Sequence, residues 1–253
     1  MKCRKSLWFQ GAALVLIAIT MLLPPGAGAQ NQYKTLHRFK GGTDGEFMYA
    51  GLVFDQKGNL YGATAGGGAG GNGTVFMLQP KADGSWTESV LYSFTGGTDG
   101  GNPETDLIFD QAGNLYGTTK WGGKCAFSDG CGVVFELKRQ TDGSWVESVL
   151  HRFSRRDGFV PTAGLIFDAA GSLYGTTVAG GDLSLHGGSG CGVGFKLAPN
   201  SNGKWTETEL HRFLDRPGDS PFAGLIFDGS GNLYGTTWGN GTSTFGSVFE
   251  VTP

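Results

Sequence analysis

The chain has 253 residues, of which 47 are glycine and 12% are aromatic, and its net charge is −3. Abundant glycine beside abundant aromatic residues indicates many tight turns around a bulky core and excludes an intrinsically disordered chain. The slightly acidic balance is unlike the basic surfaces that bind nucleic acids or anionic membranes, so we expect neither partner.

Residues 1–29 have the three parts of a secretory signal peptide. Basic residues precede an apolar run over residues 11–23, and residues 27–29 (Ala-Gly-Ala) form a small-residue cleavage site. The apolar run is shorter than the roughly 20 residues that a membrane helix needs. We therefore expect a single domain over residues 30–253 with no membrane span after cleavage. The same segment predicts a secreted protein, either extracellular or periplasmic.

The rest of the chain is a fourfold repeat. Each copy carries the tripeptide Leu-Tyr-Gly, which defines repeats one to four, at residues 60–62, 115–117, 173–175 and 233–235. Each copy predicts four strands, which we name A to D. Strand A is an apolar run that ends in Asp, B carries Leu-Tyr-Gly, C surrounds a recurring Phe, and D runs from Trp to Phe. Tight turns separate them, such as Asp142-Gly143 between C and D.

Four antiparallel strands joined by short turns are typical of one blade of a β-propeller. We therefore predict an all-β fold, a β-propeller of four four-stranded antiparallel blades. Residues 33–39 resemble strand D, and the chain ends on strand C at residues 246–251. These two segments predict a ring closed by the N-terminal strand (33–39), which would complete the last blade and remove an open strand edge. A monomer is expected. The alternatives are a β-solenoid and a dimer that shares an eight-blade ring.

Three cysteines follow the signal segment. Cys125 and Cys131 lie within one loop, so we predict a disulfide between them, which an exported protein permits. A Cys131–Cys191 bond is the alternative, because both cysteines precede the same Gly-Val pair in adjacent repeats. An odd number of cysteines leaves one thiol over in either case.

The repeat resembles a named family. The string Phe-Asp-x-x-Gly-Asn-Leu-Tyr-Gly-Thr-Thr, followed by a Gly-Gly loop and Gly-Val-Val-Phe-x-Leu, is similar to the Gloeo/Verruco (GloVer) tandem repeat over residues 33–253. The resemblance implies a bacterial exported protein of the choice-of-anchor type, with no established activity. The sequence stops at Pro253 without a sorting segment, so we expect release or periplasmic residence.

Binding residues are expected in the D–A and B–C loops, because these loops differ between repeats whereas the A–B and C–D turns do not. Trp121 and Trp238 are candidate platforms for sugars, and packing against a neighbouring blade is the alternative. Arg155, Arg156 and Arg216 could form a rim for an anionic ligand, or a solvated salt-bridge cluster. His186, with Asp182 nearby, is a further ligand-binding candidate that other repeats lack.

The residues that recur in every repeat favour structural roles. The Asp that ends each strand A is expected to cap the A–B turn, at Asp55, Asp110, Asp168 and Asp228. Asp-Gly pairs in the D–A loops favour turns over a calcium site, since no EF-hand string is present. The histidines of strand D are expected to pack on the outer strand. No metal site, cofactor or catalytic residue is expected.

We therefore expect an exported, non-enzymatic binding module for a carbohydrate, a cell-envelope polymer or a protein. A hydrolase or lyase with its site at the mouth of the propeller channel is one alternative. A structural module that assembles with copies of itself is another.

Overall fold

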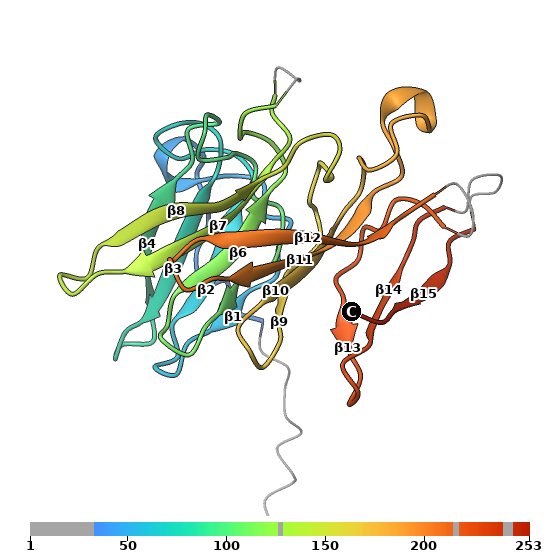
Figure 1. Ribbon diagram of the computed structural model, residues 1–253. Coiled ribbons are helices and arrows are strands. Elements are labelled where there is room, and N and C mark those ends of the chain that lie inside the picture. The colour runs from blue at the N-terminus through green and yellow to red at the C-terminus, as the bar shows by residue number, and fades with distance from the viewer. Residues whose placement is uncertain (1–32, 126–128, 215–217, 240–244) are drawn as a thin grey trace, which may run out of the picture. The chain divides into compact units, whose positions relative to one another are not determined.

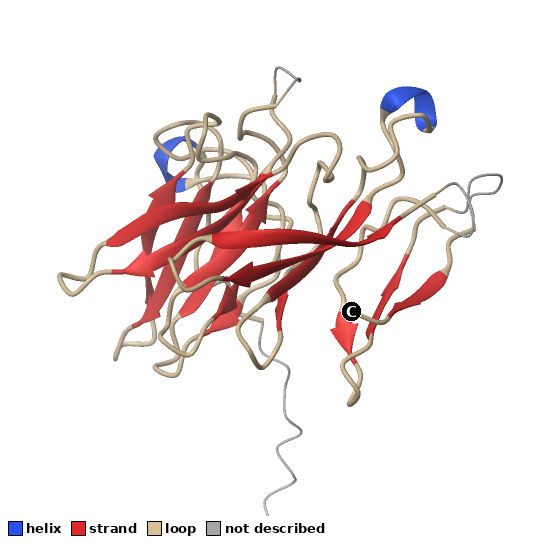
Figure 2. Ribbon diagram, in the orientation of Figure 1, coloured by secondary structure: helices blue, strands red, loops and turns tan. Residues whose placement is uncertain are grey.

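The computed structural model describes residues 33–125, 129–214, 218–239 and 245–253. The chain divides into residues 1–35 and residues 36–253, and the second unit contains every named element. That unit is all-β, as predicted, with strands β1 to β15 and two short 3-10 helices, Gly42–Asp44 and His186–Gly188 (Figures 1 and 2). Neither of these described helices has the length of a membrane span.

Each repeat forms its own antiparallel sheet in sequence order. Repeat one contains β1 (Val53–Phe54), β2 (Leu60–Thr64), β3 (Thr74–Pro80) and β4 (Trp86–Ser93). Repeat two contains β5 (Ile108–Phe109), β6 (Leu115–Thr119), β7 (Val133–Arg139) and β8 (Trp145–Arg152). Repeat three contains β9 (Ile166–Phe167), β10 (Leu173–Thr177), β11 (Val193–Pro199) and β12 (Trp205–Arg212). Repeat four contains β13 (Ile226–Phe227), β14 (Leu233–Thr236) and β15 (Val248–Val251).

The A–B turns are closed by the Asp caps that the sequence predicts. In repeat one, Asp55 Oδ1 accepts hydrogen bonds from the backbone N–H of Lys57 and Asn59 at 2.8 and 2.9 Å. The same bonds recur at Asp110, Asp168 and Asp228. Gly58 has a φ of 82°, a left-handed conformation that glycine adopts without steric cost. The turn residues thus fix the register of strands A and B.

Adjacent repeats meet at three junctions built from the same aromatic residues. The Phe that follows strand D packs edge-to-face on the strand C Phe of the next repeat, with centroids 4.9–5.1 Å apart, in the pairs Phe94–Phe135, Phe153–Phe195 and Phe213–Phe249. The strand B Tyr packs on the strand A Phe of the next repeat, in the pairs Tyr61–Phe109, Tyr116–Phe167 and Tyr174–Phe227. We number these junctions first, second and third. Edge-to-face pairs of buried rings add stability beyond their area.

The D–A and B–C loops, at the ends of the strands opposite to the A–B turns, are joined to one another as well. Every D–A loop has one residue with a left-handed backbone although it is not glycine, namely Phe47, Asn102, Val160 and Ser220. The Asn102, Val160 and Ser220 N–H groups donate to carbonyls in the B–C loop of the preceding repeat. Each D–A loop also pairs with the B–C loop of its own repeat. The D–A and B–C loops, where the sequence predicts binding residues, therefore lie together.

The predicted closure of the ring is not confirmed. Residues 33–39 have no strand assignment, and the sheet of repeat four has three strands among the described residues. Phe39 packs edge-to-face on Phe76 at 4.9 Å, which is the contact that the last Phe of a D strand makes at every junction. Residues 36–39 are therefore held against repeat one by packing, without the hydrogen bonds to β15 that we expected.

Candidate functional site

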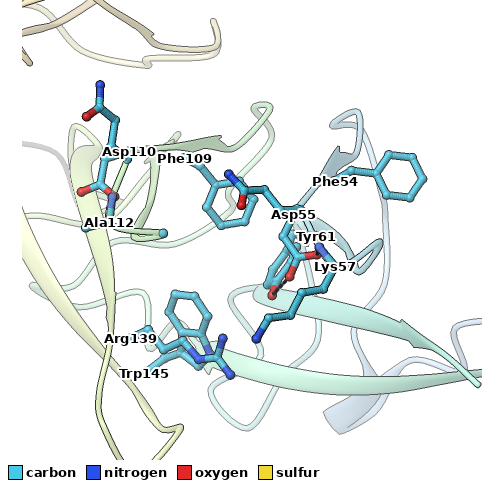
Figure 3. Close-up of a pocket in the computed structure, with 12 residues that line it drawn as sticks. Phe54, Asp55, Lys57, Tyr61, Phe109, Asp110, Ala112, Arg139 and Trp145 are labelled. Carbon is cyan, nitrogen blue, oxygen red and sulfur yellow. Dashed lines mark hydrogen bonds between the residues drawn. The ribbon is translucent and has the colours of Figure 1, made fainter.

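A cavity of about 380 Å³ lies at the first junction, on the side of the A–B and C–D turns (Figure 3). Three segments of the chain line it. They are the first A–B turn with Tyr61, the second A–B turn with Phe109, and the end of β7 with the start of β8. This volume falls in the range of small-molecule pockets.

Three aromatic rings form one side of the pocket. Tyr61 is 2% exposed, and its ring lies 5.0 Å from Phe109 and 6.2 Å from Trp145, edge-to-face in both cases. The three rings come from β2, β5 and β8, so the junction itself brings them together. The half-buried Phe109 and Trp145 have surface that a ligand can cover. Phe54 also borders the pocket, but it is exposed and points away from the other rings in Figure 3.

Charged side chains line the cavity as well. Asp55, Lys57, Asp110 and Arg139 all line the cavity. The guanidinium of Arg139 lies over the Trp145 ring, 5.9 Å from its centroid, which is a cation–π arrangement. In Figure 3 the charged ends of Lys57 and Arg139 point toward one another. Polar groups that converge beside aromatic surface are the usual composition of a ligand site.

The protonation states of Asp55 and Tyr61 are set by their shared hydrogen bond. The Tyr61 hydroxyl donates to Asp55 Oδ2 at 3.1 Å. Burial raises the pKa of Asp55, but the hydrogen bonds from Asn59, Lys57 and Tyr61 outweigh it, so the pKa lies below its usual value. Burial and the neighbouring Asp55 carboxylate raise the pKa of Tyr61 to about 12. At neutral pH the pair is therefore a carboxylate with a neutral phenol, and the low pKa makes this carboxylate a weak general base.

The same positions at the second junction have different side chains. The rings are equivalent, since Tyr116 packs on Phe167 at 5.1 Å and on Trp205 at 6.2 Å. Lys57 is replaced by Ala112 and Arg139 by Pro199. The cations thus distinguish the first junction, whereas the aromatic rings do not.

The two predicted tryptophans lie in different repeats. Trp121 is half-buried and pairs with Gly101, and the Lys120 ammonium lies 5.7 Å from its ring centroid. Trp238 is 64% exposed, and its backbone N–H donates to Ser220. Trp121 thus has the neighbours of a packed residue, and Trp238 keeps the exposure that a platform needs. Whether either binds a ligand stays a prediction.

Three of the predicted polar candidates, Arg155, Arg156 and His186, lie in or beside the B–C loop of repeat three. Arg155 Nη2 donates to the Gly188 carbonyl, and His186 Nε2 lies 3.7 Å from Asp219 Oδ2. The partner of His186 is therefore Asp219 of the next D–A loop. Asp182, which the sequence suggested, accepts hydrogen bonds from Ser184 instead.

A second cavity of about 400 Å³ lies beside this loop. Arg156 lines it together with Gly181, Asp182, Leu183, Ser184 and Arg212. This cavity lies among the variable loops, as predicted for a binding surface, but its lining has no aromatic ring. Arg216 lies outside the described residues.

The predicted disulfide is confirmed. Cys125 and Cys131 are bonded, so the Cys131–Cys191 alternative is not formed, and Cys191 is buried. Within the described ranges no group of three or more His, Cys, Asp or Glu side chains could hold a metal ion.

Sequence reasoning missed the two cations of the pocket. The sequence does contain a signal for them, because Lys57 stands where the other repeats have a small residue and Arg139 where they have proline. The recurring Asp and Gly make the A–B turns look uniform, although the residue before the Gly varies between repeats.

Comparison with solved structures gives a distant likeness. One match is a luciferin-regenerating enzyme, with 18% sequence identity and a TM-score of 0.47, over 80% of this chain and 60% of that one. This chain thus spans less than two thirds of that structure, and the likeness carries no argument about activity. No curated protein matches the sequence significantly.

Comparison with protein families gives a direct match. The model of the Gloeobacter/Verrucomicrobia repeat matches residues 26–184 and 128–253, which together cover all four repeats. The expected resemblance is therefore confirmed, and the chain belongs to the Gloeobacter/Verrucomicrobia repeat family.

Proposed function

We propose that this protein is an exported binding module that holds a saccharide in the pocket of the first junction. The observation that carries the proposal is the Phe109 and Trp145 rings beside Lys57 and Arg139 in one cavity of about 380 Å³. Aromatic faces stack on the apolar faces of sugar rings, and charged or amide groups bind the hydroxyls. Gln56 and Gln111 supply amides at the same rim.

Binding rather than catalysis is the better match for these groups. The pocket carboxylates Asp55 and Asp110 each accept hydrogen bonds within their own turn. A carboxylate whose lone pairs are occupied by turn N–H groups is a poor acceptor for a substrate proton. The signal segment and the disulfide support an exported protein, because disulfides persist in oxidising compartments.

The test is retention on an array of cell-wall and environmental glycans, with Trp145→Ala compared to Trp205→Ala. Trp205 packs on Tyr116 as Trp145 packs on Tyr61, so both variants lose a similar packing contact. We expect Trp145→Ala to lower affinity at least about tenfold, or roughly 1.4 kcal/mol, and Trp205→Ala to leave it unchanged. Equal losses in both variants, at equal folded fraction, would remove the pocket from the proposal.

The hydrolase or lyase alternative has one observation in its favour. His186, which has no counterpart in other repeats, approaches Asp219 to 3.7 Å on the variable-loop side. An orienting carboxylate beside a histidine is a common arrangement in acid–base catalysis. Release of shortened products from the same glycans, lost in His186→Ala, would favour this alternative. Unchanged glycans after long incubation would reject it.

A further inference from the structure

The charges of the pocket are not equally available to a ligand. Asp55 accepts four hydrogen bonds, from the Lys57 and Asn59 backbone, the Asn59 amide and the Tyr61 hydroxyl, at 2.8–3.1 Å. Asp110 accepts three from the equivalent groups of the second turn, at 2.8–2.9 Å. The Tyr116 hydroxyl lies 3.1 Å from Asp110 Oδ2, but its one proton is shared with Glu136 Oε1, which is closer at 2.9 Å. Four hydrogen bonds fill the lone pairs of a carboxylate. Asp55 therefore has no acceptor capacity left for a ligand, and Asp110 has little.

The two cations are in the opposite situation. Across the described ranges of the chain, neither Lys57 nor Arg139 makes an ion pair within 4.0 Å. The Arg139 guanidinium lies over the Trp145 ring, 5.9 Å from its centroid, and this cation–π contact does not occupy its N–H groups in an ion pair. The charged groups that the pocket offers to a ligand are thus mainly its two cations, although the whole chain is acidic.

Arg139 is a departure from the repeat at a defined position. It is the last residue of β7, and the equivalent residues at the ends of the other C strands are Pro80, Pro199 and Pro253. Lys57 departs likewise, since Ala112, Ala170 and Ser230 stand in the other A–B turns. The repeat scaffold does not need a cation at either place. Both cations nevertheless occur at the one junction where they border the same cavity.

We propose that the pocket selects acidic saccharides, with Arg139 as the residue that determines specificity and Lys57 as a second contact to the anionic group. The inference rests on the proposed saccharide-binding function and names the substrate class of the same site. Arginine presents a planar fork that binds a carboxylate or a sulfate through two hydrogen bonds. The aromatic side of the pocket would hold the ring that bears the anion.

The experiment compares each acidic glycan with its neutral counterpart. Uronic-acid oligosaccharides are paired with their methyl esters, and sulfated oligosaccharides with desulfated ones, so that ring structure stays constant and charge changes. We expect the protein to bind at least one acidic class about tenfold more tightly than its neutral partner. This preference should shrink as sodium chloride rises toward 1 M, where charge interactions are screened. The arm that shows the preference identifies the anionic group as carboxylate or sulfate.

Variants assign the preference to its residues. Arg139→Gln should remove most of the preference for the acidic form, measured as the ratio of the affinities for the acidic and the neutral form. Arg139→Lys should retain part of it, because it keeps the charge and loses the fork. Lys138→Gln removes an adjacent exposed charge outside the pocket and serves as the matched control.

Three outcomes would contradict the inference, in whole or in part. Equal binding of acidic and neutral forms that still depends on Trp145 would reject acidic selectivity and leave the binding function standing. Failure to retain any glycan would reject both. A preference that Arg139→Gln leaves intact in a folded variant would remove Arg139 from its role.

Discussion

The first and second junctions are built from equivalent aromatic residues but differ in their charged residues. At both junctions a Tyr, a Phe and a Trp meet at nearly the same distances, and buried Phe pairs hold the sheets together. The first junction adds Lys57 and Arg139, where the second has Ala112 and Pro199. The residues that recur in every repeat therefore build the scaffold. The residues that interrupt the repeat are the ones to examine for function.

The largest expected effect tests whether the aromatic residues of the two junctions contribute equally to the stability of the fold. Phe135 and Phe195 are fully buried, one at each junction. Replacing either with Ala should lower the free energy of unfolding by about 3–5 kcal/mol, because a large cavity remains in a packed core. Urea unfolding followed by tryptophan fluorescence measures it. A difference of more than about 1.5 kcal/mol between the two variants would show that the two junctions do not contribute equally to the free energy of unfolding.

The turn caps should give a smaller and pH-dependent effect. Hydrogen bonds from the turn hold the pKa of Asp55 and Asp168 below the ordinary value of 3.8, although burial opposes this. A lowered pKa means that the stabilisation is present above about pH 4 and is lost as the pH falls through the folded-state pKa. Asp55→Ala and Asp168→Ala should each cost about 1–2 kcal/mol at pH 7, because several hydrogen bonds are lost. Thermal unfolding between pH 2.5 and 7 should show that the variants lose less stability on acidification than the unmodified protein.

A transplant would sharpen the comparison between the junctions. Ala112→Lys with Pro199→Arg places both cations of the first junction at the second, beside the equivalent Trp205, and Ala112→Lys alone is the control because Ala112 also lines the first pocket. If the charges alone distinguish the two junctions, the double variant should bind about two acidic saccharides per chain instead of one, with the added site within about tenfold of the original affinity. Calorimetric stoichiometry measures this. A stoichiometry that stays at one would mean that the shape of the first junction also matters.

The sequence predicts those features whose signals are local. The caps at Asp55 and Asp110 follow from residues within five positions, and the Cys125–Cys131 bond from a single loop. The pocket could not be predicted in the same way, because its lining joins residues 54–57 to residues 139–145 across two repeats. The His186–Asp219 contact was missed for the same reason, since 33 positions separate the pair in the sequence. Such contacts depend on how one sheet packs on the next, and the period of the repeat does not predict this packing.

The smallest expected effect lies on the outer strands, where the two junctions differ again. Glu147 at the first junction lies near Tyr92 and Asp99, and Glu207 at the second lies near His151 and Asp157. Burial and the Asp99 carboxylate raise the pKa of Glu147 to about 7. Burial also raises the pKa of Glu207, but His151 opposes the rise.

A raised carboxyl pKa reverses the usual dependence of stability on pH. The folded protein takes up a proton on Glu147 between the ordinary pKa of 4.5 and about 7, so stability falls as the pH rises through that range. Glu147→Gln should therefore leave stability unchanged at pH 4 and raise it at pH 8 by less than about 1 kcal/mol, because the side chain is only half-buried. Glu207→Gln should raise it less, since His151 already favours the charged form. If Glu147→Gln instead destabilised the protein at pH 8, the Glu147 carboxylate would have a favourable partner in solution. Tyr92, which stands where the second junction has His151, would then not explain the difference between the junctions.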